Sequence, residues 1–144
     1  MPRKKTDPNA PALSPPVIYI AGPFRAPTPW QIELNVRRAE EVALLVAKAG
    51  GVPLCPHLIG RHFHGEPLGT PDDGQWWVEA TLELLRRCDG AIFIDGWEAS
   101  MGSIGEWNEA ARMKLTRATF NERESRESTL ALLVAAADAR RCAR

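Results

Sequence analysis

The apolar run Val17-Ile18-Tyr19-Ile20-Ala21 decides the fold of this chain. Pro16 precedes the run and Gly22-Pro23 follows it, so both of its boundaries are sharp. A strand that is apolar at every position is typical of a parallel sheet covered by helices on both faces. The run therefore predicts a central strand that opens into a loop over residues 22–29.

A strong helix start follows this loop. Thr28 suits the N-cap, Pro29 the first helical position and Gln31 the third position after the cap. Apolar residues then recur at helical spacing as far as position 49, and Gly50-Gly51 is expected to end the helix. Strand, loop and helix together predict one β–loop–α unit.

The alternation of strands and helices continues to the end of the chain. Residues 52–56 contain two prolines and predict a short strand at a sheet edge, and residues 57–74 predict a long loop. The pattern further predicts a helix over 75–88 capped by Asp72 or Asp73, strands over 91–94 and 117–120, and helices over about 102–115 and 128–142. We therefore predict an α/β fold, a Rossmann-like (flavodoxin-like) three-layer sandwich with a parallel sheet of four to five strands.

Length and composition are those of one folded domain with short tails. Of the 144 residues, 44% are hydrophobic and 25% are charged. We expect an α/β domain over residues 17–120, a helix over 121–144 packed on the same domain, and a disordered, proline-rich arm over 1–16.

The charge and the cysteine content exclude several classes of protein. The 18 basic and 18 acidic residues cancel, which argues against a protein that coats nucleic acid. The run of apolar residues that a membrane span or a signal peptide needs is not found in the sequence. Three widely spaced cysteines do not suggest a disulfide framework, so a cytoplasmic location is expected.

Three predicted loops meet at the carboxyl edge of the sheet, where folds of this kind bind ligands. They span residues 22–29, 57–74 and 95–103, and the last leads into a helix. The N–H groups at such a helix start attract phosphate or carboxylate, and Glu106, one turn in, would point into the same cleft. Ser103 and Glu106 also fit a capping box, which needs no function, and the spacing favours neither interpretation.

Two motifs together resemble the nucleoside 2-deoxyribosyltransferase superfamily, which includes 2′-deoxynucleoside 5′-phosphate N-hydrolases. They are Tyr19-Ile20-Ala21-Gly22-Pro23 on the first strand and Ser100-x-Gly102-x-x-x-Glu106 after a later strand. The likeness covers roughly residues 17–120. Within the superfamily, the chain resembles bacterial and phage branches that share the Ala-Gly-Pro and Gly-Trp-Glu-x-Ser-x-Gly motifs.

The resemblance implies an enzyme that cleaves or exchanges the N-glycosidic bond of a nucleoside or nucleoside 5′-monophosphate. Glu106 matches the nucleophile that attacks the anomeric carbon, and Tyr19 matches a tyrosine that orients it. Ser100 and Gly102 match positions that hold a 5′-phosphate. The expected substrate-binding residues are Gly22, Pro23, Phe24, Arg25, His57, Asp95, Ser100 and Gly102.

The resemblance also implies a homodimer or larger assembly. We expect no cofactor. A zinc site is not predicted, because the spacing of Cys55, His57, His62 and His64 matches no established zinc site. We expect no metal and assign a ligand-facing role to His57, His62 or Phe63. The expected partner is a small nucleoside or nucleotide, with neither a membrane nor a nucleic acid.

One position departs from the family pattern. The family normally carries an aspartate on the helix before the third strand, and the matching residue here is Thr81. The Thr81 hydroxyl cannot act as an acid in the way that an aspartate can. Glu79 and Glu83 face other directions on the predicted helix. The aspartates that could replace the missing acid from loops are Asp72, Asp73 and Asp95.

Three hypotheses about function therefore stay open. The first is an enzyme with Glu106 as nucleophile, with hydrolysis of a nucleoside 5′-monophosphate preferred over base exchange. The second is a nucleotide-binding or sensing protein of the same fold that is catalytically weak or inactive. The third is a structural partner that uses the closing helix.

Overall fold

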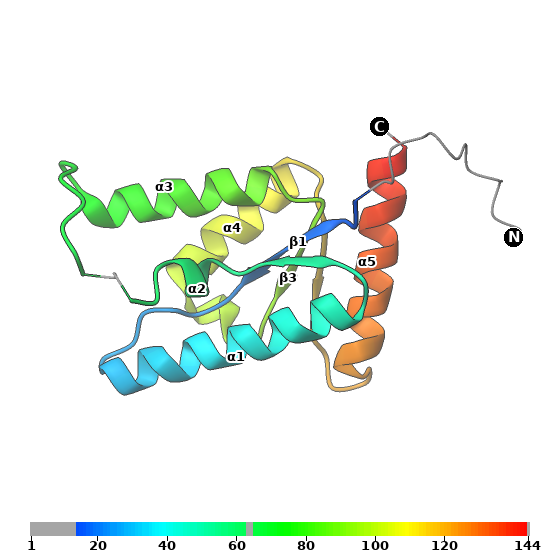
Figure 1. Cartoon of the computed structure of the whole chain (residues 1–144), viewed down its shortest axis with the longest axis horizontal. Coiled ribbons are helices and arrows are strands. Elements are labelled where there is room, and N and C mark those ends of the chain that lie inside the picture. Colours follow the sequence, from blue (N-terminus) through cyan, green and yellow to red (C-terminus); the bar gives the residue numbers. More distant parts are fainter. Residues whose placement is uncertain (1–13, 63–64, 144) are drawn as a thin grey trace, which may run out of the picture.

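The protein is described here by a computed structural model, which covers residues 14–62 and 65–143. Four parallel strands form one sheet in the order β2-β1-β3-β4. The strands are β1 (Val17–Ala21), β2 (Val52–Leu54), β3 (Gly90–Phe93) and β4 (Thr116–Thr119) (Figure 1). The predicted α/β sandwich with a parallel sheet is confirmed, and β2 is an edge strand as its prolines predict.

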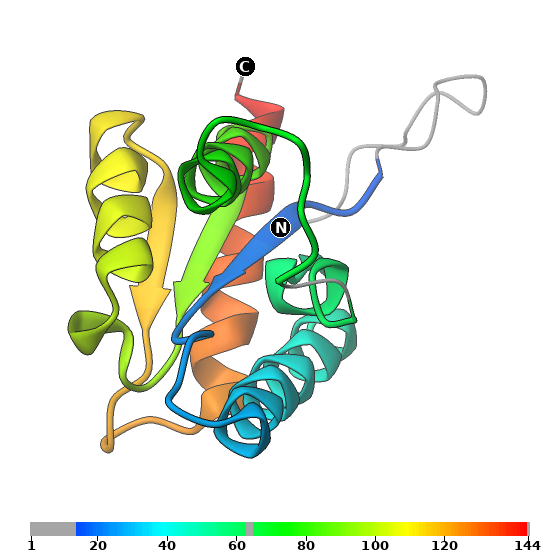
Figure 2. The ribbon, with the colours of Figure 1, turned by 90° about the vertical axis from the view of Figure 1, so that its left-hand side faces the viewer.

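Helices cover both faces of the sheet. On one face lie α1 (Pro29–Lys48) and α5 (Arg126–Cys142), and on the other lie α3 (Asp73–Arg86) and α4 (Met101–Arg112). Figure 2 shows the strands between these two layers. A short helix, α2 (Pro56–Ile59), and a 3₁₀ turn, η1 (Trp97–Ala99), lie near the carboxyl ends of the strands. None of the described helices is long and apolar enough to cross a membrane.

The signals at the ends of the helices act as predicted. The Thr28 side chain accepts a hydrogen bond from the Gln31 N–H at the start of α1, and Gly50 adopts φ +92° just after its end. Asp72 is the N-cap of α3 and accepts from the Gln75 N–H. Local capping chemistry therefore defines where these helices begin and end.

The prediction of a continuous loop over 57–74 is wrong in its first part. Pro56 begins α2, where its fixed φ suits the first helical position, and Gly60 caps the helix after Ile59. The predicted strand over 52–56 is correspondingly shorter, because only residues 52–54 pair with β1. Residues 1–13 of the predicted arm lie outside the described residues, and Pro16 already accepts a hydrogen bond from the Val52 N–H at 2.8 Å.

Strand β1 is buried on both sides. Ile18 and Ile20 pack into the apolar cluster beneath α1 and α5, whereas Tyr19 and Ala21 face α3 and α4. This alternation follows from the two-residue period of a strand. It places the Tyr19 hydroxyl on the same side of the sheet as Glu106.

Candidate functional site

Glu106 and Tyr19 form a buried pair. The Tyr19 hydroxyl donates a 2.5 Å hydrogen bond to Oε1 of Glu106, across 87 positions of sequence. Glu106 is 8% exposed and Tyr19 is 0% exposed. The structure thus brings together the two residues that the sequence predicted as catalytic, with one on the second turn of α4 and the other in the middle of β1.

Burial dominates the ionisation of this pair. It raises the pKa of Glu106 to about 7, although the hydrogen bond from Tyr19 acts in the opposite direction. The pKa of Tyr19 lies well above its ordinary value, first because of burial and second because of the neighbouring carboxylate. Tyr19 therefore keeps its proton and donates it, while Glu106 changes charge near neutral pH.

Thr81 is the third polar side chain at this pair. It lies on α3 one turn before Leu85, which is fully buried in the same cluster as Tyr19. Its hydroxyl donates to the Val78 carbonyl at 3.0 Å, and its side chain lowers the pKa of both Glu106 and Tyr19. Thr81, which stands where the nucleoside 2-deoxyribosyltransferase pattern has an aspartate, therefore faces the candidate site.

The start of α4 is organised around Ser100. Its side chain is the N-cap and accepts from the Ser103 N–H at 3.3 Å. The capping-box interpretation of Ser103 and Glu106 is therefore wrong, because Ser100 occupies the cap position that Ser103 would need. A Cβ at Gly102 would meet nothing within 4 Å, so the first turn borders open space.

Aromatic packing holds this helix start against the sheet. The Trp97 and Trp107 rings stack at 4.5 Å, and Phe93 at the end of β3 meets Trp107 edge-on at 4.9 Å. The Arg117 guanidinium lies 3.7 Å from the centroid of a Trp107 ring. These contacts fix η1 and α4 together, and with them the positions of Ser100 and Glu106.

The loop after β1 packs closely against the loop after β3. A Cβ on Gly22 would lie 2.3 Å from Cγ1 of Ile94, so this glycine is required by packing. Pro23 packs on Gly96, which has φ +89°. Gly22 and Pro23 were predicted to bind substrate, and the structure places them where the two loops pack against each other.

Phe24 and Arg25 extend this loop toward α1 and α3. The Phe24 carbonyl accepts a hydrogen bond from Nδ2 of Asn35 at 3.1 Å. Arg25 is exposed, and its guanidinium lies 3.5 Å from the position that a Cβ of Gly74 would take. Arg25 thus lies beside the first turn of α3.

His57 supports the loop after β1 from below. It is 6% exposed, and its Nε2 lies 3.0 Å from the Pro23 carbonyl, which can only accept a hydrogen bond. Burial lowers its pKa, so the ring is neutral with a proton on Nε2. The predicted contact of His57 with substrate stays a prediction, while its contact with Pro23 ties α2 to the loop.

Besides His57, His62 is the one residue of the 57–74 segment considered as ligand-facing or metal-binding that the structure describes. His62 is exposed, and Phe63 and His64 lie outside the described residues. In the part of the chain that the structure describes, no three His, Cys, Asp or Glu side chains gather as metal ligands.

Residues 16–120 match a family described as a domain of unknown function, DUF7768. The chain belongs to this family. The match contains all four strands together with Tyr19, Thr81 and Glu106, and α5 follows it. A comparison with curated proteins finds no match.

Three loop aspartates of this DUF7768 domain were predicted as possible replacements for the missing acid, and each binds another group. Asp95 forms an ion pair with Arg126 at 2.6 Å, beside a hollow of about 260 Å³ near the end of β4. Asp72 caps α3, and Asp73 accepts from the Leu68 N–H at 2.9 Å. None of these contacts joins Asp72, Asp73 or Asp95 to Glu106 or Tyr19, so a role as the replacing acid stays a prediction.

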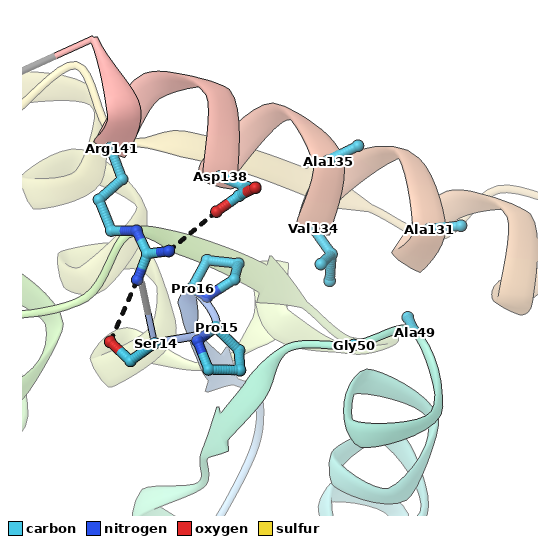
Figure 3. Close-up of a pocket in the computed structure, with 10 residues that line it drawn as sticks. All are labelled: Ser14, Pro15, Pro16, Ala49, Gly50, Ala131, Val134, Ala135, Asp138 and Arg141. Carbon is cyan, nitrogen blue, oxygen red and sulfur yellow. Dashed lines mark hydrogen bonds and ion pairs between the residues drawn. The ribbon is translucent and has the colours of Figure 1, made fainter. Parts of the chain in front are cut away.

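A larger hollow lies at the opposite edge of the DUF7768 sheet (Figure 3). It measures about 380 Å³ and lies between the segment before β1, the end of α1 and one side of α5. Arg141 crosses it to Asp138 at 2.9 Å and to Ser14 at 3.4 Å. It contains none of the predicted site residues, so the candidate site remains the Tyr19–Glu106 pair.

Proposed function

We propose that this DUF7768 domain cleaves the N-glycosidic bond of a nucleoside or nucleoside 5′-monophosphate, with Glu106 as the nucleophile. The observation that carries the proposal is the buried Glu106 carboxyl, held by the Tyr19 hydroxyl at 2.5 Å behind an open helix start. The resemblance of the two motifs to the nucleoside 2-deoxyribosyltransferase superfamily supplies the reaction class.

The hydrogen bond gives the two carboxylate oxygens different roles. Tyr19 holds Oε1, which leaves Oε2 of Glu106 to attack the anomeric carbon. The bond between that carbon and the base nitrogen breaks, and its electron pair leaves with the base. A glycosyl-enzyme ester results, which water then hydrolyses to regenerate the carboxylate.

The start of α4 suits the phosphate of a nucleotide. First-turn N–H groups and the positive end of the helix dipole attract anions. A side chain is missing at Gly102, so a phosphate can approach the backbone there, and the Ser100 hydroxyl retains its own proton to donate. Arg25 is a further cation on the neighbouring loop. These features favour nucleoside 5′-monophosphates, and hydrolysis over base exchange.

Ionisation of Glu106 would set the pH dependence of the reaction. Only the carboxylate can attack, and its pKa of about 7 leaves a substantial protonated fraction at neutral pH. We expect kcat/KM to rise with pH through about 7 and to level off above it.

Free base measured by chromatography tests this proposal. The protein is incubated with ribo- and deoxyribonucleosides and with their 5′-monophosphates. Base release should fall by at least about 1000-fold in Glu106→Gln. Glu109→Gln is the matched control, because Glu109 lies one turn further along α4 and is paired with Arg86 and Arg112.

The outcomes separate the competing functions. No base release from any substrate, or full activity in Glu106→Gln, would contradict the proposal. Binding of a nucleotide in calorimetry without turnover would support a sensing protein, which is the alternative that Thr81 favours. Addition of a second free base distinguishes an exchange reaction from hydrolysis.

A further inference from the structure

The described hydroxyl and thiol groups near Glu106 are weak acids, and three of them already donate a hydrogen bond. Tyr19 donates its hydroxyl proton to Glu106 itself, and Thr81 donates its own to the Val78 carbonyl at 3.0 Å. Cys88, behind Tyr19, donates its S–H to the Leu84 carbonyl at 3.3 Å, and burial raises the pKa of this thiol to about 12. Each of these groups is a poor proton donor to a departing base.

The five acids that the sequence offered at or near the position of the missing aspartate also have partners of their own. Asp95 pairs with Arg126, and the two α3 acids at its N-terminus hold backbone N–H groups. On the outer side of α3, Glu79 accepts from Gln75 and Glu83 pairs with Arg87. None of these five acids is therefore held against the Tyr19–Glu106 pair by a contact of its own.

A neutral base needs a proton in order to leave. When the glycosidic bond breaks, the base takes the electron pair and becomes an anion unless an acid protonates it, and such general acid catalysis contributes about 10²–10⁴-fold. A base that is already cationic in its glycoside leaves as a neutral molecule. Its departure requires no acid from the protein.

We infer that the substrate of this site carries a cationic base, as in the N-glycosides of pyridinium rings or of N7-alkylated purines. The inference rests on the proposed function, because it names the substrate class for the same nucleophile. Oε2 of Glu106 forms a bond to the anomeric carbon while the carbon–nitrogen bond breaks. Its electron pair neutralises the ring nitrogen, and the water that later hydrolyses the ester releases one proton to solvent.

The buried carboxylate fits this substrate electrostatically. A cationic ring close to Glu106 would favour the ionised carboxylate, which is the reactive form. Burial lowers the local dielectric and strengthens that attraction. A neutral base would offer no such help, so the preference for a cation acts on both the leaving group and the nucleophile.

Two matched pairs of substrates test the inference. The first pair is 7-methylguanosine 5′-monophosphate and guanosine 5′-monophosphate, which differ by one methyl group and one charge. The second is nicotinamide mononucleotide and its dihydro form, which share ring size and phosphate. We expect the cationic member of each pair to be cleaved at least about 100-fold faster in kcat/KM, after subtraction of the Glu106→Gln rate.

The outcomes distinguish this inference from the proposed function. Equal cleavage of the cationic and neutral members, lost in Glu106→Gln, would overturn the inference and leave the proposed function standing. No Glu106-dependent cleavage of any of the four compounds would overturn the inference, and the wider set of nucleosides and 5′-monophosphates described above then decides the proposed function separately. Preferential, Glu106-dependent cleavage of the cationic members supports both.

A variant at Thr81 provides a second test on the same protein. Thr81→Asp places an acid beside the pair and should raise cleavage of guanosine 5′-monophosphate, so that the ratio within the pair narrows at least about tenfold. Thr81→Asn has a similar size but carries no transferable proton, and it should keep the wild-type ratio. A ratio that is unchanged in a folded Thr81→Asp protein would count against the inference.

Discussion

The two faces of the sheet differ in the side chains that they bury: one is aliphatic and the other contains a buried polar pair. Beneath α1 and α5, β1 and β3 contribute Ile18, Ile20 and Ile92 to a cluster of aliphatic side chains. Beneath α3 and α4, β1 buries Tyr19 beside Glu106 of α4. Burial of a polar group costs free energy that a hydrogen bond offsets only in part, so the second face is the less stable choice.

This difference indicates where the fold has been shaped for something besides stability. Ser103 adds to it, because its buried hydroxyl oxygen has no hydrogen-bond partner among the described residues. By this reasoning, an aliphatic face with the same helices would make the fold more stable. The polar face therefore points to the site, and the aliphatic face supplies the stability that supports it.

The largest effect is expected from the aliphatic face. Ile92→Ala should lower the free energy of unfolding by about 4 kcal/mol, because Ile92 is 0% exposed in the centre of its cluster. Urea denaturation measures the loss. Leu132→Ala is the control, since Leu132 is 64% exposed on α5 and its loss should change stability by less than about 0.5 kcal/mol. Similar losses in the two variants would remove the basis of the comparison.

On the polar face, Glu106→Gln should increase stability while abolishing activity. In wild type, the unfolded chain loses the Glu106 proton near pH 4.5, whereas the folded protein retains it up to about pH 7. Stability therefore falls as pH rises between these values, by about 3 kcal/mol in total. The variant lacks this fall, so its advantage should be absent below pH 4.5 and greatest above pH 7.

Glu109→Gln gives the opposite sign. Hydrogen bonds from Arg112 and Arg86 lower the pKa of Glu109 to about 2, so its carboxylate stabilises the fold above pH 4.5 and this contribution is lost as pH falls toward 2. Chemical denaturation at several pH values separates the two glutamates. If Glu106→Gln were as unstable as Glu109→Gln at pH 8, burial of the Glu106 carboxylate would not be destabilising the folded protein.

A smaller effect is expected where the two faces meet at the carboxyl edge. Gly22→Ala should lower the free energy of unfolding by about 2 kcal/mol, because its Cβ would overlap the Ile94 side chain. Gly105→Ala is the control: its Cβ would meet nothing within 4 Å, and alanine in a helix should stabilise by up to about 1 kcal/mol. A neutral Gly22→Ala, measured by thermal unfolding, would show that the packing between the two loops adapts easily.

Sequence reasoning predicted most of the fold because its signals are local. The apolar run over 17–21 and the cap formed by Thr28 and Gln31 act within a few residues. Helix α2 was missed because its four residues are too short to show a helical period. The burial of His57 was also missed, since nothing near it in sequence shows that the Pro23 carbonyl reaches its ring.

The candidate site was predicted by resemblance more than by spacing. Tyr19 and Glu106 are 87 positions apart, so only the paired motifs connected them. Spacing alone also suggested Ser103 as the cap of α4, in a capping box with Glu106. The turn at Gly96, with its positive φ, and η1 after it bring the chain to Ser100 as the cap, and this depends on packing of the loop against Pro23. Contacts of that kind are not encoded within a short window of sequence.

The smallest and most specific effect should come from the hydrogen bond within the pair. Tyr19→Phe removes the donor that lowers the pKa of Glu106, so the carboxyl should titrate above pH 7. The loss of one buried hydrogen bond should cost about 1 kcal/mol of stability. In the pH profile of kcat/KM, the acid limb should move to higher pH, while the rate at its plateau changes less. A limb that stays in place would show that Tyr19 packs beside Glu106 without tuning its charge, and the polar face would then differ from the aliphatic one in composition alone.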